Sequence, residues 1–310
     1  MKKSLIVILG PTASGKTSLA TNLAKKYNGE IICADSRSVY KKLDIGTAKP
    51  TKYEQAQVPH HMLDVVEAGE IFTVAEFKKG AEEKIAGIFS LDKTPFLVGG
   101  SGLYIDSVIY GLQIPKVPPD WQLREKLEKL SKEQLLSKIK KLDPKFAKIV
   151  DINNKRRLIR ALEVIKKTGK KFSALRRKNP PKYPILILGI NVPRRELIKK
   201  IDDRVDQRIK QGMIEEIEGL IRYGVDPKWL DNLGLEYRYL SRYVRGQISK
   251  AEAIRQLKSA IHQFARRQMT WFKKNKDIIW IKDSTEADPS RTGEGLRAEA
   301  EEKINKFLQK

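Results

Sequence analysis

The sequence of 310 residues is poor in the features of secreted and membrane proteins. It has one cysteine, Cys33, so no disulfide can form within the chain. That cysteine lies in an apolar run, where a small buried side chain is a simpler interpretation than a reactive thiol. No stretch approaches the roughly 18 apolar residues of a membrane-spanning helix, and an expected strand follows Met1 where a signal peptide would begin. We expect a globular, cytoplasmic protein with no membrane partner, acting as a monomer.

Acidic residues are few compared with basic ones, which gives the chain a strong positive charge. The sequence has 38 aspartates and glutamates against 62 lysines and arginines, a formal net charge of +24. Residues 115–183 contain 22 basic and 7 acidic residues, so they carry 15 of the 24 excess charges. A solvated lysine-rich surface would spread the charge evenly, whereas a basic segment of this kind favours a polyanionic partner such as nucleic acid.

A phosphate-binding motif follows the first apolar run, residues 5–9, and precedes an amphipathic run at 18–27. The motif consists of Gly10, Pro11, Thr12, Ala13, Ser14, Gly15, Lys16 and Thr17. Strand, glycine loop and helix form the context in which backbone N–H groups and a helix N-terminus surround an anion. Lys16 would add a positive charge, and Thr17 would ligate Mg²⁺. We therefore predict a phosphorylated substrate and an Mg²⁺ cofactor, while the loop itself does not distinguish ATP from other phosphate esters.

Two further apolar runs predict parallel strands that end near this loop. Residues 30–34 lead to Asp35, at the strand end where open α/β sheets bind ligands. Asp35 would either cap a following helix or face the loop as a carboxylate that binds metal or accepts a proton, and both remain open. Residues 94–98 are followed by Gly99 and Gly100. The acidic residue with which an ATPase holds Mg²⁺ at this position is therefore missing. ATP hydrolysis is less favoured as a result, and the glycines indicate close approach of backbone to a ligand.

Prolines divide the rest of the chain. Those at 115, 118 and 119 end the α/β pattern, and helices are expected at 121–130, 131–141 and 154–167. Prolines at 180, 181 and 184 precede the apolar run 185–192, which we expect to return to the sheet. Later segments predict helices at 195–211, 214–223 and 250–274, an edge strand at 278–281 and a solvated helix after Asp283. The predicted fold is α/β: a P-loop NTPase-like core with a parallel sheet, from residues 1–114 plus 184–310, and a mostly helical basic insertion at 115–183.

Two of the expected helices carry groups suited to phosphate contact. Arg156 and Arg160 share one helix face, while Leu158 belongs to the apolar face. The helix at 250–274 ends in a mixture of basic and aromatic residues that suits stacking on bases and contact with phosphates. The same mixture also fits a packed amphipathic helix, so both interpretations stay open.

Six short segments together resemble the tRNA dimethylallyltransferase family. They are GPTASGKT at 10–17, DSRSVY at 35–40, GTAKP at 46–50, GGSGLY at 99–104, RRLIRALEV at 156–164 and ARRQMTWF at 265–272. The resemblance extends to about Trp280 and accounts for the missing ATPase acid. It implies transfer of a dimethylallyl group from dimethylallyl diphosphate to N6 of the adenosine 3′-adjacent to the anticodon in tRNA. The phosphate loop would then hold diphosphate, the leaving group.

The resemblance also implies roles for individual residues. The catalytic ones would be Asp35, Ser101, Lys16 and Arg204. Lys16, Arg204 and Thr17 with Mg²⁺ would neutralise the diphosphate, and Asp35 would take the proton from N6. Ser101 stands at the family's usual threonine, close to the reacting atoms.

The partner implied by the resemblance is the anticodon stem-loop of tRNA, with the insertion as a tRNA-binding domain. The expected tRNA contacts are Asp35, Ser36, Arg37, Ser38, Ser101, Arg124, Arg156, Arg157, Leu158, Ile159, Arg160, Arg266, Arg267, Gln268, Trp271 and Lys273. Two other functions share the phosphate loop: a free-nucleotide isopentenyltransferase, and a P-loop kinase or ATPase acting on RNA. The first gives no reason for the basic insertion, and the second lacks its acid.

Overall fold

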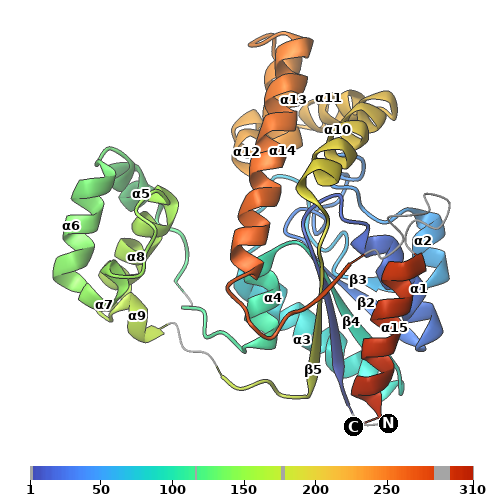
Figure 1. The fold of residues 1–310 in the computed structure, drawn as a ribbon. Coiled ribbons are helices and arrows are strands. Elements are labelled where there is room, and N and C mark those ends of the chain that lie inside the picture. The colour runs from blue at the N-terminus through green and yellow to red at the C-terminus, as the bar shows by residue number, and fades with distance from the viewer. Residues whose placement is uncertain (1–2, 116, 176–178, 283–293, 310) are drawn as a thin grey trace. The chain divides into compact units, whose positions relative to one another are not determined.

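The computed structural model describes residues 3–115, 117–175, 179–282 and 294–309. Its strands form one parallel sheet in the order β3-β2-β4-β1-β5-β6 (Figure 1). The strands are β1 Leu5–Leu9, β2 Gly29–Ala34, β3 His60–His61, β4 Thr94–Gly99, β5 Ile185–Ile190 and β6 Ile279–Ile281. The predicted α/β fold with a parallel sheet is confirmed, including an edge strand close to 278–281.

Helices account for most of the remaining chain. They are α1 Lys16–Lys26, α2 Lys52–Gln57, α3 Val74–Ser90, α4 Gly102–Ile109, α5 Trp121–Glu128, α6 Lys132–Leu142, α7 Pro144–Ala147, α8 Lys155–Thr168, α9 Phe172–Leu175, α10 Arg194–Lys210, α11 Met213–Arg222, α12 Pro227–Leu233, α13 Leu235–Val244, α14 Lys250–Phe272 and α15 Glu294–Leu308. No helix in the part of the chain that the structure describes is both long and apolar enough to cross a bilayer.

The sheet core is apolar on both faces, as expected for parallel strands covered by helices. Alternate strand residues such as Ile6 and Ile8 pack with Leu23 of α1 and Ile304 of α15. Figure 1 shows α3 on the opposite side of the sheet from α1 and α15. The sequence signal for these strands was continuous hydrophobicity, because both faces are buried.

The register of the central strands brings three loops to one edge of the sheet. Leu9 of β1 and Ala34 of β2 are both paired with Gly99 of β4. The residues that follow these three positions, beginning with Gly10, Asp35 and Gly100, therefore leave the sheet at the same level. This is the carboxyl edge, where ligands bind in open α/β sheets.

The chain divides into two compact units, Met1–Ile105 with Lys182–Lys310 and Asp106–Pro181. The second unit begins within α4, earlier than the expected insertion at 115–183, of which residues 116 and 176–178 lie outside the described residues. It has a core of its own, in which α5, α6, α7, α8 and α9 pack around side chains such as Leu135, Phe146 and Leu162. In the first unit, helices α10–α14 form another apolar cluster with residues from the segment after β2.

The C-terminal helix corrects one prediction from the sequence. The charged tail after Asp283 does contain a helix, but α15 is not solvated on all sides, because Leu296, Ala300 and Ile304 are buried. Spaced four residues apart, they form an apolar stripe that packs against the sheet core. Residues 283–293 of this tail lie outside the described residues.

Candidate active site

The phosphate loop joins β1 to α1 and leaves the amino end of that helix open for an anion. Ala13 and Gly15 have φ angles of 62° and 80°, left-handed values that occur in anion-binding backbone nests. Gly15 precedes the helix and provides no side-chain cap for the free N–H groups of its first turn. The Lys16 ammonium donates to the carbonyl of Pro11 at 3.0 Å, within the same loop. The loop therefore offers N–H groups and a positive charge to a phosphate.

Arg204 of α10 brings a second positive charge to the loop. Its Nη2 donates to the Thr12 hydroxyl, whereas its buried Nε has no hydrogen-bond partner among the described residues. Burial and the neighbouring Arg208 lower the pKa of Arg204 to about 10, so the guanidinium is still protonated at neutral pH. A buried N–H group without an acceptor costs free energy, and an anion in the loop would supply that acceptor.

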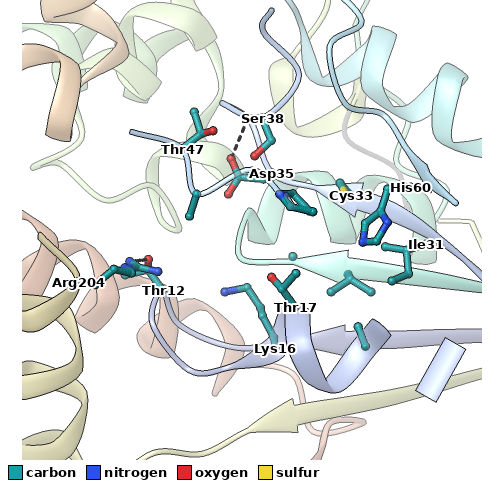
Figure 2. Close-up of a pocket in the computed structure, with 15 residues that line it drawn as sticks. Thr12, Lys16, Thr17, Ile31, Cys33, Asp35, Ser38, Thr47, His60 and Arg204 are labelled. Carbon is teal, nitrogen blue, oxygen red and sulfur yellow. Dashed lines mark hydrogen bonds between the residues drawn. The ribbon is translucent and has the colours of Figure 1, made fainter. Parts of the chain in front are cut away.

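Asp35 stands at the carboxyl end of β2, facing the loop. Its Oδ1 accepts hydrogen bonds from the backbone N–H groups of Arg37 at 2.8 Å and Ser38 at 3.3 Å. These bonds hold the carboxylate as a helix cap would, but a series of turns follows and no helix begins here. Figure 2 shows Asp35 and Ser38 on one side of a cavity, with Lys16 and Thr17 on the other. Of the two alternatives for Asp35, the structure therefore supports a carboxylate that faces the loop.

Ser101 connects the ends of β2 and β4. Its backbone N–H donates to the Ala34 carbonyl at 3.2 Å, and its hydroxyl accepts from the backbone N–H of Ser36 at 3.0 Å. These bonds fix the chain on both sides of Asp35. Ser101 thus supports the position of the carboxylate, and its proximity to the reacting atoms stays a prediction.

Two cavities adjoin at the carboxyl edge of the sheet. The residues that line both are Thr12, Lys16, Asp35 and Thr47. The first cavity also has an apolar wall, formed by Ala20, Ile31, Cys33 and Val98. The second is bordered by groups from several helices, including Arg208, Glu236, Phe264 and Gln268. Ligands in the two cavities would meet beside Asp35 and Lys16.

Cys33 and the adjacent histidines do not form a metal site. Burial raises the pKa of the Cys33 thiol, which keeps it protonated. His60 contacts the Val58 carbonyl through Nδ1 at 2.7 Å, and His61 contacts the Glu30 carboxylate through Nε2 at 2.6 Å. Among the described residues, no group of three His, Cys, Asp or Glu side chains is arranged to hold a metal ion.

A half-buried acid that sequence reasoning missed holds the turn that carries Thr47. Glu216 of α11 accepts hydrogen bonds from three consecutive backbone N–H groups, at residues 44, 45 and 46, over 2.8, 2.6 and 3.1 Å. It also accepts from the hydroxyl of the buried Tyr237 at 2.9 Å. Thr47 is therefore fixed in the wall of both cavities by a side chain that lies 169 positions later in the sequence.

Arg208 is a second residue that sequence reasoning missed. It is 6% exposed and donates to the Gly46 carbonyl at 3.2 Å and to Glu236 at 3.4 Å. Arg208 follows Arg204 by four residues, a spacing that places both on one helix face. That spacing was the available signal, since two arginines on the buried face of an amphipathic helix require acceptors.

Comparison with known proteins identifies the family. A family model described as IPP transferase matches residues 38–275, and one described as Isopentenyl transferase matches residues 3–71. The tRNA dimethylallyltransferase of Acetivibrio thermocellus is 43% identical over 92% of this chain and 94% of its own length. This chain belongs to the tRNA dimethylallyltransferase family. The prediction from the six sequence segments is thereby confirmed.

Other relatives and solved structures agree. The tRNA dimethylallyltransferase of Synechocystis is 43% identical over 89% of this chain and 90% of its own length. The tRNA isopentenylpyrophosphate transferase structure from Bacillus halodurans is 35% identical and covers 99% of both chains, with a TM-score of 0.72. A eukaryotic dimethylallyltransferase described as acting on tRNA is 26% identical, with a TM-score of 0.82 over 99% of this chain and 79% of its own.

The residues predicted to contact tRNA in this chain are in different environments. On α14 and just after it, Arg266, Arg267 and Lys273 are exposed, and Trp271 is 36% exposed. Gln268 is only 7% exposed, and protein backbone groups occupy its amide. Its contact with tRNA stays a prediction, because the side chain also lines the second cavity.

The residues of the segment 35–38, also predicted to contact tRNA, differ in their exposure as well. Ser36 is exposed, whereas Ser38 is 4% exposed. Arg37 donates through Nε and Nη2 to the Leu233 carbonyl at 3.1 and 2.9 Å, and its guanidinium lies over the Phe264 ring at 5.6 Å. Arg37 therefore ties the segment beside Asp35 to the helical cluster.

The arginines of the second unit have partners within that unit. Arg124 and Arg160 both donate to Glu163, which is fully buried, at distances from 2.5 to 2.9 Å. Arg157 lies over the Phe146 ring at 5.8 Å, and Arg156 is exposed.

Two apolar residues in the same helix correct the predicted list of tRNA contacts. Leu158 and Ile159 are 0% and 3% exposed, because both belong to the core of the second unit. Their side chains stabilise that core and do not reach an RNA.

Proposed function

We propose that this chain transfers a dimethylallyl group from dimethylallyl diphosphate to N6 of the adenosine 3′-adjacent to the anticodon in tRNA. The products are N6-dimethylallyladenosine and diphosphate. The observation that carries this proposal is the place of Asp35, a carboxylate where two cavities adjoin, across from a phosphate loop with Lys16 and Arg204. An allylic carbon reacts when its diphosphate is stabilised as a leaving group, and the adenine amine must lose a proton. The site offers groups for both tasks.

The diphosphate would be bound by the loop, with its charge balanced by Lys16 and Arg204. As the bond between C1 and the bridging oxygen breaks, the electron pair stays on the diphosphate. The ammonium and guanidinium groups stabilise this growing charge, and the loop is already arranged for it before the reaction. The apolar wall around Ile31, Cys33 and Val98 would receive the hydrocarbon tail.

Asp35 would act as the general base. N6 of adenine forms the new bond to C1, and its proton passes to the carboxylate. Both hydrogen bonds that the carboxylate accepts from described residues go to Oδ1, so Oδ2 is available for this proton. The adenine would enter through the second cavity, beside Phe264 and Arg37, after leaving the stack of its loop.

A magnesium ion fits the donor set of this site. Mg²⁺ is commonly held by one or two protein oxygens together with substrate phosphates and water. Thr17 presents a hydroxyl at the start of α1 in the wall of the first cavity, and no larger cluster of protein ligands occurs among the described residues. Thr17 would therefore hold the ion together with the diphosphate, whose charge the ion would offset when bound.

We expect Lys16 to take up a proton when dimethylallyl diphosphate binds above about pH 8. Burial, assisted by Arg204, lowers the pKa of Lys16 from 10.5 to about 8, so the free protein loses this charge as the pH rises. A bound anion favours the charged form and raises the pKa again. Calorimetry at about pH 9 in buffers of different ionisation enthalpy should show uptake of up to about one proton per site. Lys16→Arg, which stays charged, should bind without this uptake, and equal uptake by both proteins would assign the proton to another group.

Transfer RNA fits the charge of the chain. Exposed basic residues occur in both units, Arg266, Arg267 and Lys273 in the first and Arg156 in the second. Contacts with phosphates can offset the few kcal/mol needed to unstack the target adenosine. A tRNA substrate also agrees with the expected cytoplasmic location.

Neutralising Arg156, Arg157 and Arg160 should weaken binding of an anticodon stem-loop and flatten its dependence on salt. Each lost phosphate contact lowers the log-log slope by about 0.7 to 0.9. Arg156→Ala alone should lower the slope by the amount of one contact, because its side chain is exposed. Lys79→Ala, an exposed lysine on α3, is the charge-matched control. An unchanged slope in the triple variant would remove the basis for placing tRNA on this helix.

The product in cells tests the proposed function. Transfer RNA from a strain lacking the gene should contain no N6-dimethylallyladenosine or its further-modified forms, and the wild-type gene should restore them. A deletion strain whose tRNA nucleosides are unchanged would contradict the proposal.

A further inference from the structure

Gln268 joins the two loops that carry the opposite halves of the active site. Its Oε1 accepts from the backbone N–H of Thr12 in the phosphate loop at 2.9 Å. Its Nε2 donates to the backbone carbonyl of Gly100, after β4, at 2.8 Å. One partner is a donor and the other an acceptor, and an amide in this orientation satisfies both.

The connection continues to the carboxylate. Gly100 precedes Ser101, whose hydroxyl accepts from the N–H of Ser36, the residue after Asp35. On the other side, Thr12 also accepts a hydrogen bond from Arg204 through its hydroxyl. One buried amide therefore lies between the groups that bind the leaving group and the segment that holds the base.

The space around this amide is closely filled. A side chain at Gly100 would collide with Nε2 of Gln268, so the glycine permits the approach. Thr12 precedes Ala13, which is held at a φ of 62°, a conformation that a non-glycine residue adopts only with support from its surroundings. The hydrogen bond to Thr12 supplies such support.

We propose that Gln268 is a positioning residue for the transfer reaction, which sets the phosphate loop and the Asp35 segment at the separation that the reaction requires. The inference rests on the proposed function. Its physical basis is that small errors in the placement of reacting groups cost large factors in rate. Gln268 would act through the backbone groups of Thr12 and Gly100.

Two substitutions separate this role from a contact with RNA. Gln268→Met conserves the approximate volume and removes both hydrogen bonds, and should lower kcat by about 10- to 100-fold. The affinity for the anticodon stem-loop should stay within a few fold, because both hydrogen bonds of the amide go to protein backbone. Wild-type turnover is measured first, since its absence would overturn the proposed function rather than this inference.

Gln268→Glu adds a test that a merely structural role would not pass. A protonated carboxyl can accept from Thr12 and donate to Gly100 as the amide does, whereas a carboxylate repels the Gly100 carbonyl. The ratio of wild-type to variant kcat should therefore fall as the pH is lowered and the carboxyl takes up a proton. For Gln268→Met the ratio of wild-type to variant kcat should not change with pH. Gln263 is exposed on the same helix, and Gln263→Glu should have the kcat of the wild type at each pH.

Three results would overturn the inference. The first is a Gln268→Met variant with the kcat of the wild type. The second is a Gln268→Met variant that loses stem-loop affinity but keeps its kcat at saturation. The third is a ratio of wild-type to variant kcat that is as independent of pH for Gln268→Glu as for Gln268→Met. Melting temperatures of all variants accompany the kinetics. If Gln268→Glu fails to fold, Gln268→Met still decides the inference through the division between kcat and stem-loop affinity.

Discussion

Asp35→Asn is expected to lower kcat by about 10²-fold or more, because a general base typically contributes about 10²- to 10⁴-fold. The asparagine oxygen can still accept the N–H groups of Arg37 and Ser38, so the turn should keep its shape. The loss should therefore lie in the removal of the N6 proton. Single-turnover kinetics with saturating stem-loop and dimethylallyl diphosphate measure it directly.

The binding data for Asp35→Asn decide how this loss is interpreted. Stem-loop affinity should remain within a few fold of the wild type. Asp92→Asn is a suitable control, because this exposed aspartate has a φ of 52°, which asparagine tolerates. A loss of stem-loop binding as large as the loss of kcat would reassign Asp35 to recognition or folding.

Arg204→Ala should lower kcat/KM by about 10²- to 10³-fold, the size expected when one preorganised donor to a developing anion is removed. Among the described residues, the buried Nε of Arg204 has no hydrogen-bond acceptor. Arg204→Lys should recover only part of the activity, because lysine retains the charge but not the planar fork of donors. Steady-state kinetics with varied dimethylallyl diphosphate provide the comparison.

Arg204 also holds the Thr12 hydroxyl, so its role needs a second variant. Thr12→Val removes that hydrogen bond and leaves the guanidinium in place, and it should cost much less than Arg204→Ala. Arg195→Ala, an exposed arginine on the same helix, should have almost no effect. If Thr12→Val and Arg204→Ala were equally impaired, Arg204 would act by shaping the loop rather than by stabilising the diphosphate.

The parts of the fold with local signals were predictable. The predicted strands at 5–9 and 94–98 are apolar runs that are each followed by a glycine. The structure has β1 and β4 at these positions. The burial of helix α15 was harder to predict, because its charged residues outnumber its three buried apolar residues. Its packing partner α1 lies far away in the sequence, and no local pattern indicates that contact.

The candidate site was predictable where a residue's role follows from its own motif. Lys16 belongs to a fixed spacing, and Asp35 follows a buried strand at the ligand-binding edge. Glu216 and Gln268 were not predictable in this way, because each acts on backbone groups of a distant loop. A polar residue in a basic and aromatic segment suggests RNA contact, and only the packed structure shows that the Gln268 amide faces inward.

The choice of acceptor distinguishes a tRNA dimethylallyltransferase from the other enzymes that share the phosphate loop. Purified wild-type protein is given dimethylallyl diphosphate and either AMP or a stem-loop with adenosine 3′-adjacent to the anticodon, and the products are analysed by mass spectrometry. We expect one dimethylallyl group on that adenosine, release of diphosphate and no reaction with AMP. Efficient prenylation of AMP, or brisk ATP hydrolysis without any transfer to the stem-loop, would contradict it.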